Sequence, residues 1–150
     1  MESRFMARAI ELAREAYNAG EVPVGAVIVK DGVIVGEGRN RREEQNRSVS
    51  HAEIEAIEAA NAALGEWRLN GCTIYVTLEP CLMCAGAIAA ARISEIVFGA
   101  YDTERGFVCS RADINALAGT DITVFGGIKE DECAAPVAEF FARRRNPPAK

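Results

Sequence analysis

Histidine is almost absent from this chain, with one, His51, among 150 residues. A metal site with two histidines is therefore excluded within one chain, and any histidine-based catalysis must use His51. The chain also has no apolar run close to the roughly 20 residues that span a bilayer, so we expect no membrane segment. Residues 1–20 mix glutamates with arginines and resemble neither a signal peptide nor a transit peptide.

An excess of positive charge is absent too, because the formal net charge is −5. An acidic total by itself argues against a nucleic-acid partner, but the charge is unevenly distributed. The arginines gather in one central loop and at the end of the last helical segment: Arg39, Arg41, Arg42 and Arg47, then Arg143, Arg144 and Arg145. Because Glu43 and Glu44 interrupt the first group, a solvated charged surface and a path for single-stranded nucleic acid are both open interpretations.

Disulfide bonds are not expected in this chain. Five cysteines, an odd number, occur without a secretory signal, which favours reduced thiols and a cytoplasmic location. The length of 150 residues and the 49% of hydrophobic residues suit one domain, residues 1–150, that is large enough for its own core.

Hydrophobic periodicity predicts an alternation of strands and helices. Apolar residues at helical spacing indicate helices over residues 4–19, 51–64, 80–91 and 131–144. Runs of β-branched residues indicate strands over residues 24–29, 33–35, 73–78, 95–99 and 122–125, and Asp31-Gly32 predicts a hairpin between the first two. Residues 36–50 and 102–120 are expected to be irregular connections. This order predicts an α/β fold with three α/β/α layers around a five-stranded mixed sheet.

Two cysteines three residues apart, Cys81 and Cys84, follow Pro80 and an apolar strand. If Pro80 opens a helix, both thiols lie on one face of its first turn. Backbone amides and the helix dipole favour thiolate over thiol at that position. Alone, this spacing fits a metal site, a redox pair or coincidence.

His51 is the remaining candidate ligand, and it begins another helix with Glu53 two residues later. Facing helix starts would place one nitrogen and two sulfurs around one zinc ion per chain, with the fourth tetrahedral position left for water. Glu53 would then accept a proton from that water and pass it to a leaving nitrogen. The structural alternative for Glu53 is a capping box with Ser50 as the N-cap.

Two other interpretations of the cysteines stay open. A structural zinc site completed by Cys109 or Cys133 would use the same three ligands and would not need Glu53. A redox pair would need neither His51 nor Glu53. The combination of His-x-Glu with Pro-Cys-x-x-Cys favours a catalytic metal site over both, because it is the signature of zinc nucleobase deaminases.

Longer runs resemble the bacterial transfer-RNA adenosine deaminases, a branch of the cytidine deaminase superfamily. They are residues 21–27, 36–38, 40, 51–53, 67–69, 75–81, 83–87, 97–100, 131–133 and 140–141. The resemblance implies a cytidine-deaminase-like fold and a homodimer that converts the wobble adenosine of a tRNA anticodon to inosine. It implies a zinc ion held by His51, Cys81 and Cys84, with Glu53 as the proton shuttle. It also implies substrate contacts at Asn40, Asp102, Phe141 and Arg144.

One segment departs from the pattern of that family. The family usually has a lysine soon after the position of Asp102, whereas this chain has Glu104, followed by Arg105. A glutamate beside a phosphate path weakens RNA binding, although Arg105 and Arg111 are placed to restore the charge. Two alternatives are therefore kept: a deaminase of a free nucleobase or nucleoside, and a binding module with an inert zinc site.

Overall fold

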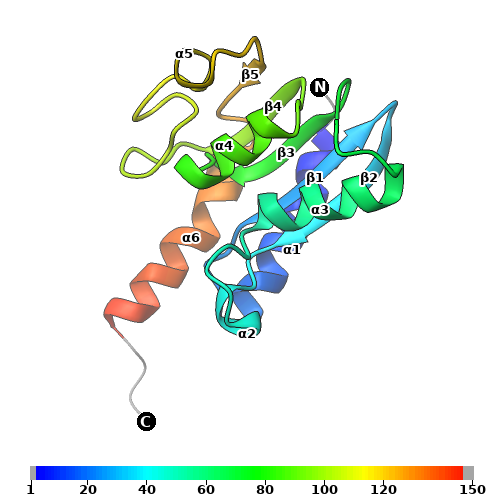
Figure 1. Ribbon diagram of the computed structural model, residues 1–150. Coiled ribbons are helices and arrows are strands. Elements are labelled where there is room, and N and C mark those ends of the chain that lie inside the picture. Colours follow the sequence, from blue (N-terminus) through cyan, green and yellow to red (C-terminus); the bar gives the residue numbers. More distant parts are fainter. Residues whose placement is uncertain (1–2, 147–150) are drawn as a thin grey trace.

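A five-stranded mixed sheet forms the middle layer of the computed structural model, which describes residues 3–146 (Figure 1). The strands lie in the order β2-β1-β3-β4-β5. β1 is antiparallel to β2 and β3, whereas β3, β4 and β5 are parallel. Their bounds are β1 Gly25–Lys30, β2 Val33–Arg39, β3 Thr73–Leu78, β4 Glu95–Ala100 and β5 Thr123–Phe125. The predicted mixed sheet of five strands is confirmed.

Helices cover both faces of this sheet (Figure 1). α1 and α6 pack on one face, and α3, α4 and α5 pack on the other, each group with its own apolar core. The helices are α1 Ser3–Asn18, α2 Arg42–Gln45, α3 Ala52–Leu64, α4 Leu82–Ala90, α5 Ile114–Ala118 and α6 Glu130–Arg145. The three predicted layers are therefore present. No helix within residues 3–146 has the length and apolar character needed to cross a bilayer.

Successive residues of the central strands point into the two cores in turn. In β1, Ala26 and Ile28 belong to the core beneath α3 and α4, whereas Val27 and Val29 belong to the core beneath α1. This follows from the two-residue period of a strand, and burial on both sides explains why β1 is a continuous apolar run. The sheet is therefore packed between two helical layers. Because β3 and β4 are parallel, their carboxyl ends lie at the same edge of the sheet.

The predicted hairpin between β1 and β2 is confirmed. Lys30 pairs with Val33, and the two turn residues, Asp31 and Gly32, have φ values of 50° and 76°. Such a turn requires positive φ at both central residues, and aspartate followed by glycine tolerates it.

The prediction for β2 was too short, since the strand continues to Arg39 rather than ending at residue 35. Gly36 and Gly38 carry no β-branched signal, and this is why the pattern missed them. They are needed because α3 lies directly on β2. An added Cβ would lie 2.4 Å from the Ala56 carbonyl oxygen at Gly36 and 2.2 Å from the Ala52 carbonyl oxygen at Gly38. These glycines let the start of α3 approach the sheet.

Two short helices lie in segments predicted to be irregular. α2 is one turn long and depends on the Glu21 carboxylate, which accepts hydrogen bonds from the backbone N–H of Glu43 (3.2 Å) and Glu44 (2.7 Å). α5 begins at an aspartate cap, where Asp113 accepts from the backbone of Asn115 and Ala116. Such short helices carry too little periodicity to be predicted, because their stability comes from the capping groups.

Candidate active site

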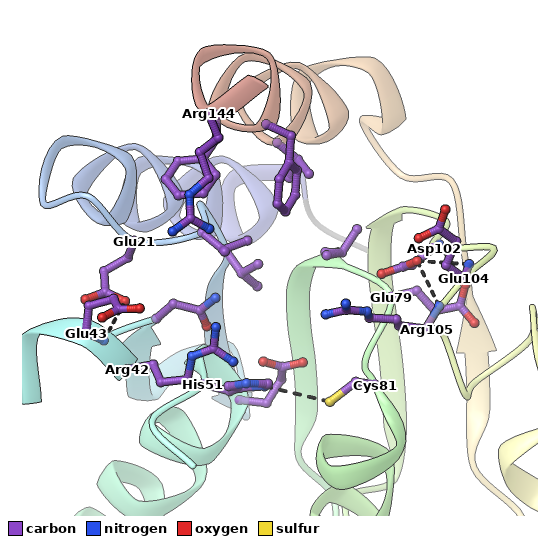
Figure 2. Close-up of a pocket in the computed structure, with 18 of the residues that line it drawn as sticks. Glu21, Arg42, Glu43, His51, Glu79, Cys81, Asp102, Glu104, Arg105 and Arg144 are labelled. Carbon is purple, nitrogen blue, oxygen red and sulfur yellow. Dashed lines mark hydrogen bonds between the residues drawn. The ribbon is translucent and has the colours of Figure 1, made fainter. Parts of the chain in front are cut away.

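A pocket of about 600 Å³ opens where α3 and α4 begin, at the carboxyl ends of β3 and β4 (Figure 2). Its floor contains His51, Glu53 and Cys81. One side is formed by the rim loop, which we define as residues 101–111, and another by α6. Seven of the eight predicted site residues line this pocket, namely Asn40, His51, Glu53, Cys81, Asp102, Phe141 and Arg144. The eighth, Cys84, is fully buried beneath it.

The candidate metal ligands lie at the starts of two helices. His51 is the N-cap of α3 and Cys81 is the N-cap of α4, both with extended backbone. The prediction that Pro80 opens α4 was wrong, because the first helical residue is Leu82. Cys84 is the third residue of α4, so its sulfur lies one turn above Cys81. Figure 2 shows His51 and Cys81 facing each other across the floor of the pocket.

The three ligand atoms have the spacing of a tetrahedral zinc site. His51 Nδ1 lies 3.7 Å from Cys81 Sγ and 3.5 Å from Cys84 Sγ. Zinc bonds of about 2.05 Å to nitrogen and about 2.3 Å to sulfur place a tetrahedral nitrogen–sulfur pair about 3.6 Å apart. All three ligand atoms lie within 4.8 Å of one another. The donor set therefore fits zinc, with one coordination position left for water.

The two thiols interact, and this interaction shifts their pKa values in opposite directions. A hydrogen bond with Cys84 lowers the pKa of Cys81 to about 4, although burial opposes the shift, and His51 adds to the lowering. The same bond raises the pKa of Cys84, and burial raises it further. Both sulfurs must lose their protons to bind a metal ion, so metal binding at this pair would release protons.

Glu53 is buried beside the ligands, with 4% of its surface exposed. Burial raises its pKa to about 7. A carboxyl group with a pKa near neutrality can both accept and donate a proton at physiological pH, which is the requirement for general acid–base catalysis. Because Glu53 also lines the pocket, a molecule bound there can reach it.

The capping box predicted for Ser50 and Glu53 is wrong. The N-cap of α3 is His51, which places Glu53 second in the helix. Ser50 instead donates its hydroxyl hydrogen bond to Gln45 Oε1 at 2.8 Å. The first backbone N–H of α3, at Ala52, is bound by Asn40 Oδ1 at 2.9 Å. Glu53 therefore does not act as a capping residue. Asn40, from the segment after β2, accepts the helix N–H that a capping side chain would otherwise accept.

A structural zinc site with four protein ligands also fails. Among residues 3–146, the group that can hold a metal ion consists of His51, Cys81 and Cys84 alone. Cys109 is exposed on the rim loop, and Cys133 packs against the sheet at Gly99. Cys72 is fully buried, as expected of a small apolar side chain.

The predicted arginine loop is largely occupied by internal ion pairs. Arg39 is 8% exposed and binds Glu44 at 3.0 Å. Arg41 binds Glu44 at 2.8 Å and Glu55 at 2.9 Å. Carboxylates therefore neutralise both guanidinium groups locally, and this weakens the nucleic-acid interpretation for these two arginines. Arg42, in contrast, lines the pocket, where Figure 2 shows it close to His51.

The remaining predicted contacts lie on the rim loop and on α6. Asp102 Oδ1 accepts from the backbone N–H of Glu104 (3.1 Å) and Arg105 (3.0 Å), so one of its oxygens closes a turn. Phe141 is 40% exposed. Arg144 stacks on the ring of Phe140, with its guanidinium carbon 5.2 Å from the ring centroid.

The sequence analysis missed Glu79, the residue that organises the rim loop. It is 2% exposed and directly follows β3. Burial raises its pKa, but hydrogen bonds from Ser110, Cys109 and Asp102 more than offset this and lower it. A glutamate before Pro-Cys carries no local signal for this role, because its partners lie 23 to 31 residues later in the chain.

Comparisons with known proteins agree with this site. Residues 1–100 match the family described as the cytidine and deoxycytidylate deaminase zinc-binding region. The tRNA-specific adenosine deaminase of Bacillus subtilis strain 168 is 44% identical over 145 residues, which are 94% of this chain and 89% of that protein. A solved structure of a tRNA:A34 deaminase that edits A to I at the wobble position is 42% identical, with a TM-score of 0.87 over 90% of this chain and 99% of that chain.

A further solved structure, guanine deaminase from Bacillus subtilis, is 43% identical but matches a smaller part. It covers 69% of this chain and 67% of that chain, with a TM-score of 0.65. The family match and the identity to relatives over nearly the whole length confirm the resemblance found in the sequence. The chain belongs to the cytidine and deoxycytidylate deaminase family with its zinc-binding region.

Proposed function

We propose that this protein is a zinc-dependent hydrolytic deaminase that converts adenosine to inosine at the wobble position of a tRNA anticodon. The observation that carries this proposal is the open three-ligand site, with nitrogen–sulfur distances of 3.5 and 3.7 Å, beside a buried carboxyl group. The substrate class rests on the relatives, because the tRNA-specific deaminase of Bacillus subtilis matches 94% of this chain.

His51, Cys81 and Cys84 would hold the zinc ion. When bound, zinc acidifies a water molecule and so supplies a nucleophile at neutral pH. The two sulfurs sit at and near the N-terminus of α4, where backbone N–H groups stabilise negative charge. These three side chains come from two helix starts, so the site forms only when α3 and α4 are packed together.

Glu53 would move the protons of the reaction. It would accept a proton from the attacking water and deliver one to the adenine ring nitrogen as the C6–oxygen bond forms. Glu53 would then take the remaining proton from the new C6 hydroxyl group and pass it to the exocyclic nitrogen, so that the C6 carbonyl forms, the C6–nitrogen bond breaks and ammonia leaves. The burial of Glu53 supports this assignment, because a carboxyl group shielded from bulk water exchanges protons mainly with what the pocket holds.

Asn40, Asp102, Phe141 and Arg144 would hold the substrate. The Oδ1 atom of Asn40 accepts from α3, so its NH2 group is the part of this pocket-lining side chain that would donate to a bound base. The half-exposed ring of Phe141 suits stacking on an unpaired base, and the guanidinium of Arg144 suits a phosphate. A base buried in this pocket must leave its stack, as in other nucleobase deaminases.

A free-base deaminase is the less supported alternative. The guanine deaminase structure matches this chain at 43% identity but with a TM-score of 0.65, whereas the tRNA deaminase structure reaches 0.87. An anticodon stem-loop compared with free adenosine, guanine and cytosine tests the proposal. We expect inosine in the stem-loop and little turnover of the free compounds. Turnover of a free compound alone would overturn the substrate class, and binding without any turnover would indicate an inert zinc site.

We also propose a cytoplasmic homodimer with a single deaminase domain in each chain. Five free cysteines suit a reducing compartment. Leu82 at the start of α4 and Leu117 in α5 are each 60% exposed and offer apolar surface to a second copy. Sedimentation of the full chain tests the dimer: a mass of one chain at micromolar concentration would contradict it.

A further inference from the structure

The rim loop is attached to the body of the protein by one buried carboxylate. Glu79 Oε1 accepts a hydrogen bond from the backbone N–H of Asp102 at 3.1 Å and another from the Ser110 hydroxyl. Glu79 Oε2 accepts from the backbone N–H of Val108 (3.2 Å), Cys109 (2.8 Å) and Ser110 (2.8 Å). Five donors from both ends of the loop thus converge on one side chain that is 2% exposed.

The loop fits closely around this carboxylate. An added Cβ at Gly106 would lie 2.3 Å from Glu79 Cδ, so only glycine fits there. The loop is closed further by Gly106 N–H to the Asp102 carbonyl at 2.8 Å and by Phe107 N–H to the Pro80 carbonyl at 2.9 Å. A carboxylate with this many donors is costly to replace, because each N–H would lose its buried partner.

The consequence of this arrangement is the direction of Arg105. Asp102 Oδ1 closes a turn by accepting from the backbone of Glu104 and Arg105. From that turn the Arg105 side chain extends into the pocket, and Glu104 lines the pocket beside it (Figure 2). Within residues 3–146 the Arg105 guanidinium has no ion-pair or hydrogen-bond partner. The other arginine of the loop, Arg111, is used internally, since it donates to the Glu104 carbonyl at 3.1 Å.

We propose that Arg105 is a specificity-determining residue that binds a phosphate of the RNA strand beside the flipped nucleotide, and that Glu79 is the positioning residue that aims it. This inference rests on the RNA substrate proposed above. A guanidinium without a partner at a pocket is suited to an oxyanion, and a free nucleobase carries none. Arg105 therefore favours a polynucleotide over a free base, and it supplies the positive charge that Glu104 removes from the rim.

Binding of an anticodon stem-loop at several salt concentrations tests the role of Arg105. The Glu53→Ala variant serves as the parent, so that the substrate is not consumed. In Arg105→Gln we expect the slope of log affinity against log salt to become shallower by about 0.7, the value for one phosphate contact on a single strand. Affinity should fall roughly tenfold, as expected for one charge-assisted hydrogen bond. Arg68→Gln, the same charge change at an exposed side chain away from the pocket, should leave both unchanged.

Variants of Glu79 and Ser110 test the positioning role. Glu79→Gln places an NH2 group against backbone donors, so the amides of Val108, Cys109 and Ser110 should exchange faster with deuterium. Affinity for the stem-loop should fall in the Arg105 parent and change little further in an Arg105→Gln background. Zinc content should stay at one ion per chain. If Glu79→Gln does not fold, Ser110→Ala removes only the hydroxyl hydrogen bond to Glu79. Its loss of affinity, measured with and without Arg105→Gln, should then show the same dependence on Arg105 with a smaller magnitude.

Each outcome decides one part of the inference. If the parent binds the stem-loop and Arg105→Gln keeps its affinity and salt slope, the role of Arg105 is wrong. Additive losses for Glu79→Gln and Arg105→Gln would overturn the positioning role, because Glu79 would then act on binding by another route. If the parent itself does not bind the stem-loop, the proposed function fails rather than this inference.

Discussion

The two sides of the pocket are built in different ways. On the metal side, His51, Cys81 and Cys84 sit at the starts of two regular helices that pack on the sheet. On the rim side, an irregular loop takes its shape from five hydrogen bonds to Glu79. The metal side is specified by short motifs, and the rim side by contacts between distant residues. Chemistry and substrate choice can therefore change separately in this fold.

Glu53→Ala should give the largest effect on the metal side. We expect the single-turnover rate on a stem-loop to fall by about 10²–10⁴-fold, the usual contribution of a general acid–base group. Zinc content, measured by mass spectrometry, should remain one ion per chain, since Glu53 is not a ligand. Glu58→Ala, at an exposed position of the same helix, is the control and should keep the rate. Full activity in Glu53→Ala would remove this residue from the mechanism.

Cys84→Ala should remove metal and stability together. Loss of a buried ligand should take zinc content towards zero, and the free energy of unfolding should drop by about 2.7 kcal/mol if free zinc had stood at 100 times its dissociation constant. Cys109→Ser, at an exposed thiol of the rim loop, should change neither quantity. A Cys84→Ala protein that keeps zinc at one ion per chain would show that the ligand set is wrong.

Gly38→Ala should lower the stability of the protein by displacing the backbone at the start of α3. Its Cβ would lie 2.2 Å from the Ala52 carbonyl oxygen, so the start of α3 has to move. We expect a loss of about 1–3 kcal/mol in the free energy of unfolding, measured with urea, as for other overpacked sites. Gly86→Ala is the matched control, because its Cβ meets nothing within 4 Å and the gain in helix propensity is about 0.5–1 kcal/mol. A loss at Gly86 would instead show that a partner covers α4.

The Arg8–Glu37 pair, outside both sides of the pocket, should have the smallest effect. Arg8 Nε lies 2.7 Å from Glu37 Oε2, and this hydrogen bond lowers the pKa of Glu37 despite partial burial. Because the folded pKa is the lower one, the stabilisation is present above the ordinary glutamate pKa and is lost as pH falls through the folded value. Glu37→Gln should cost about 0.2–1 kcal/mol at pH 7 and nothing in strong acid, measured by thermal unfolding. An equal cost at both pH values would mean that the pair acts by packing.

The elements that could be predicted are those with a repeating apolar pattern. Four helices and five strands were predicted within a few residues, because their buried faces have the period of a helix or a strand. The wrong bounds and the missed helices lie in segments without a repeating apolar pattern. β2 continues through Gly36 and Gly38 because α3 needs the space, and α2 exists because Glu21 caps it.

The candidate site could be predicted to a similar extent. Metal ligands and a proton shuttle must be particular residue types at particular spacings, so His51, Glu53, Cys81 and Cys84 could be named as candidates, and the structure brings them together. The arginines of residues 39–47 could not be sorted from the sequence, because any arginine in a loop is a possible phosphate contact. Only the ion pairs of Arg39 and Arg41 with Glu44 show that these two are used internally.

The sequence by itself determined the family and the candidate metal site, because the zinc-binding motif, the nearby glutamate and the alternation of strands and helices are all local patterns. The tertiary structure decided the shape of the pocket and the direction of its charges. Glu79 and the loop residues that bind it are 23 to 31 residues apart, and Arg105 reaches the pocket from that loop. Local spacing carries no information on such contacts, since they exist only after β3 and the rim loop have been packed together.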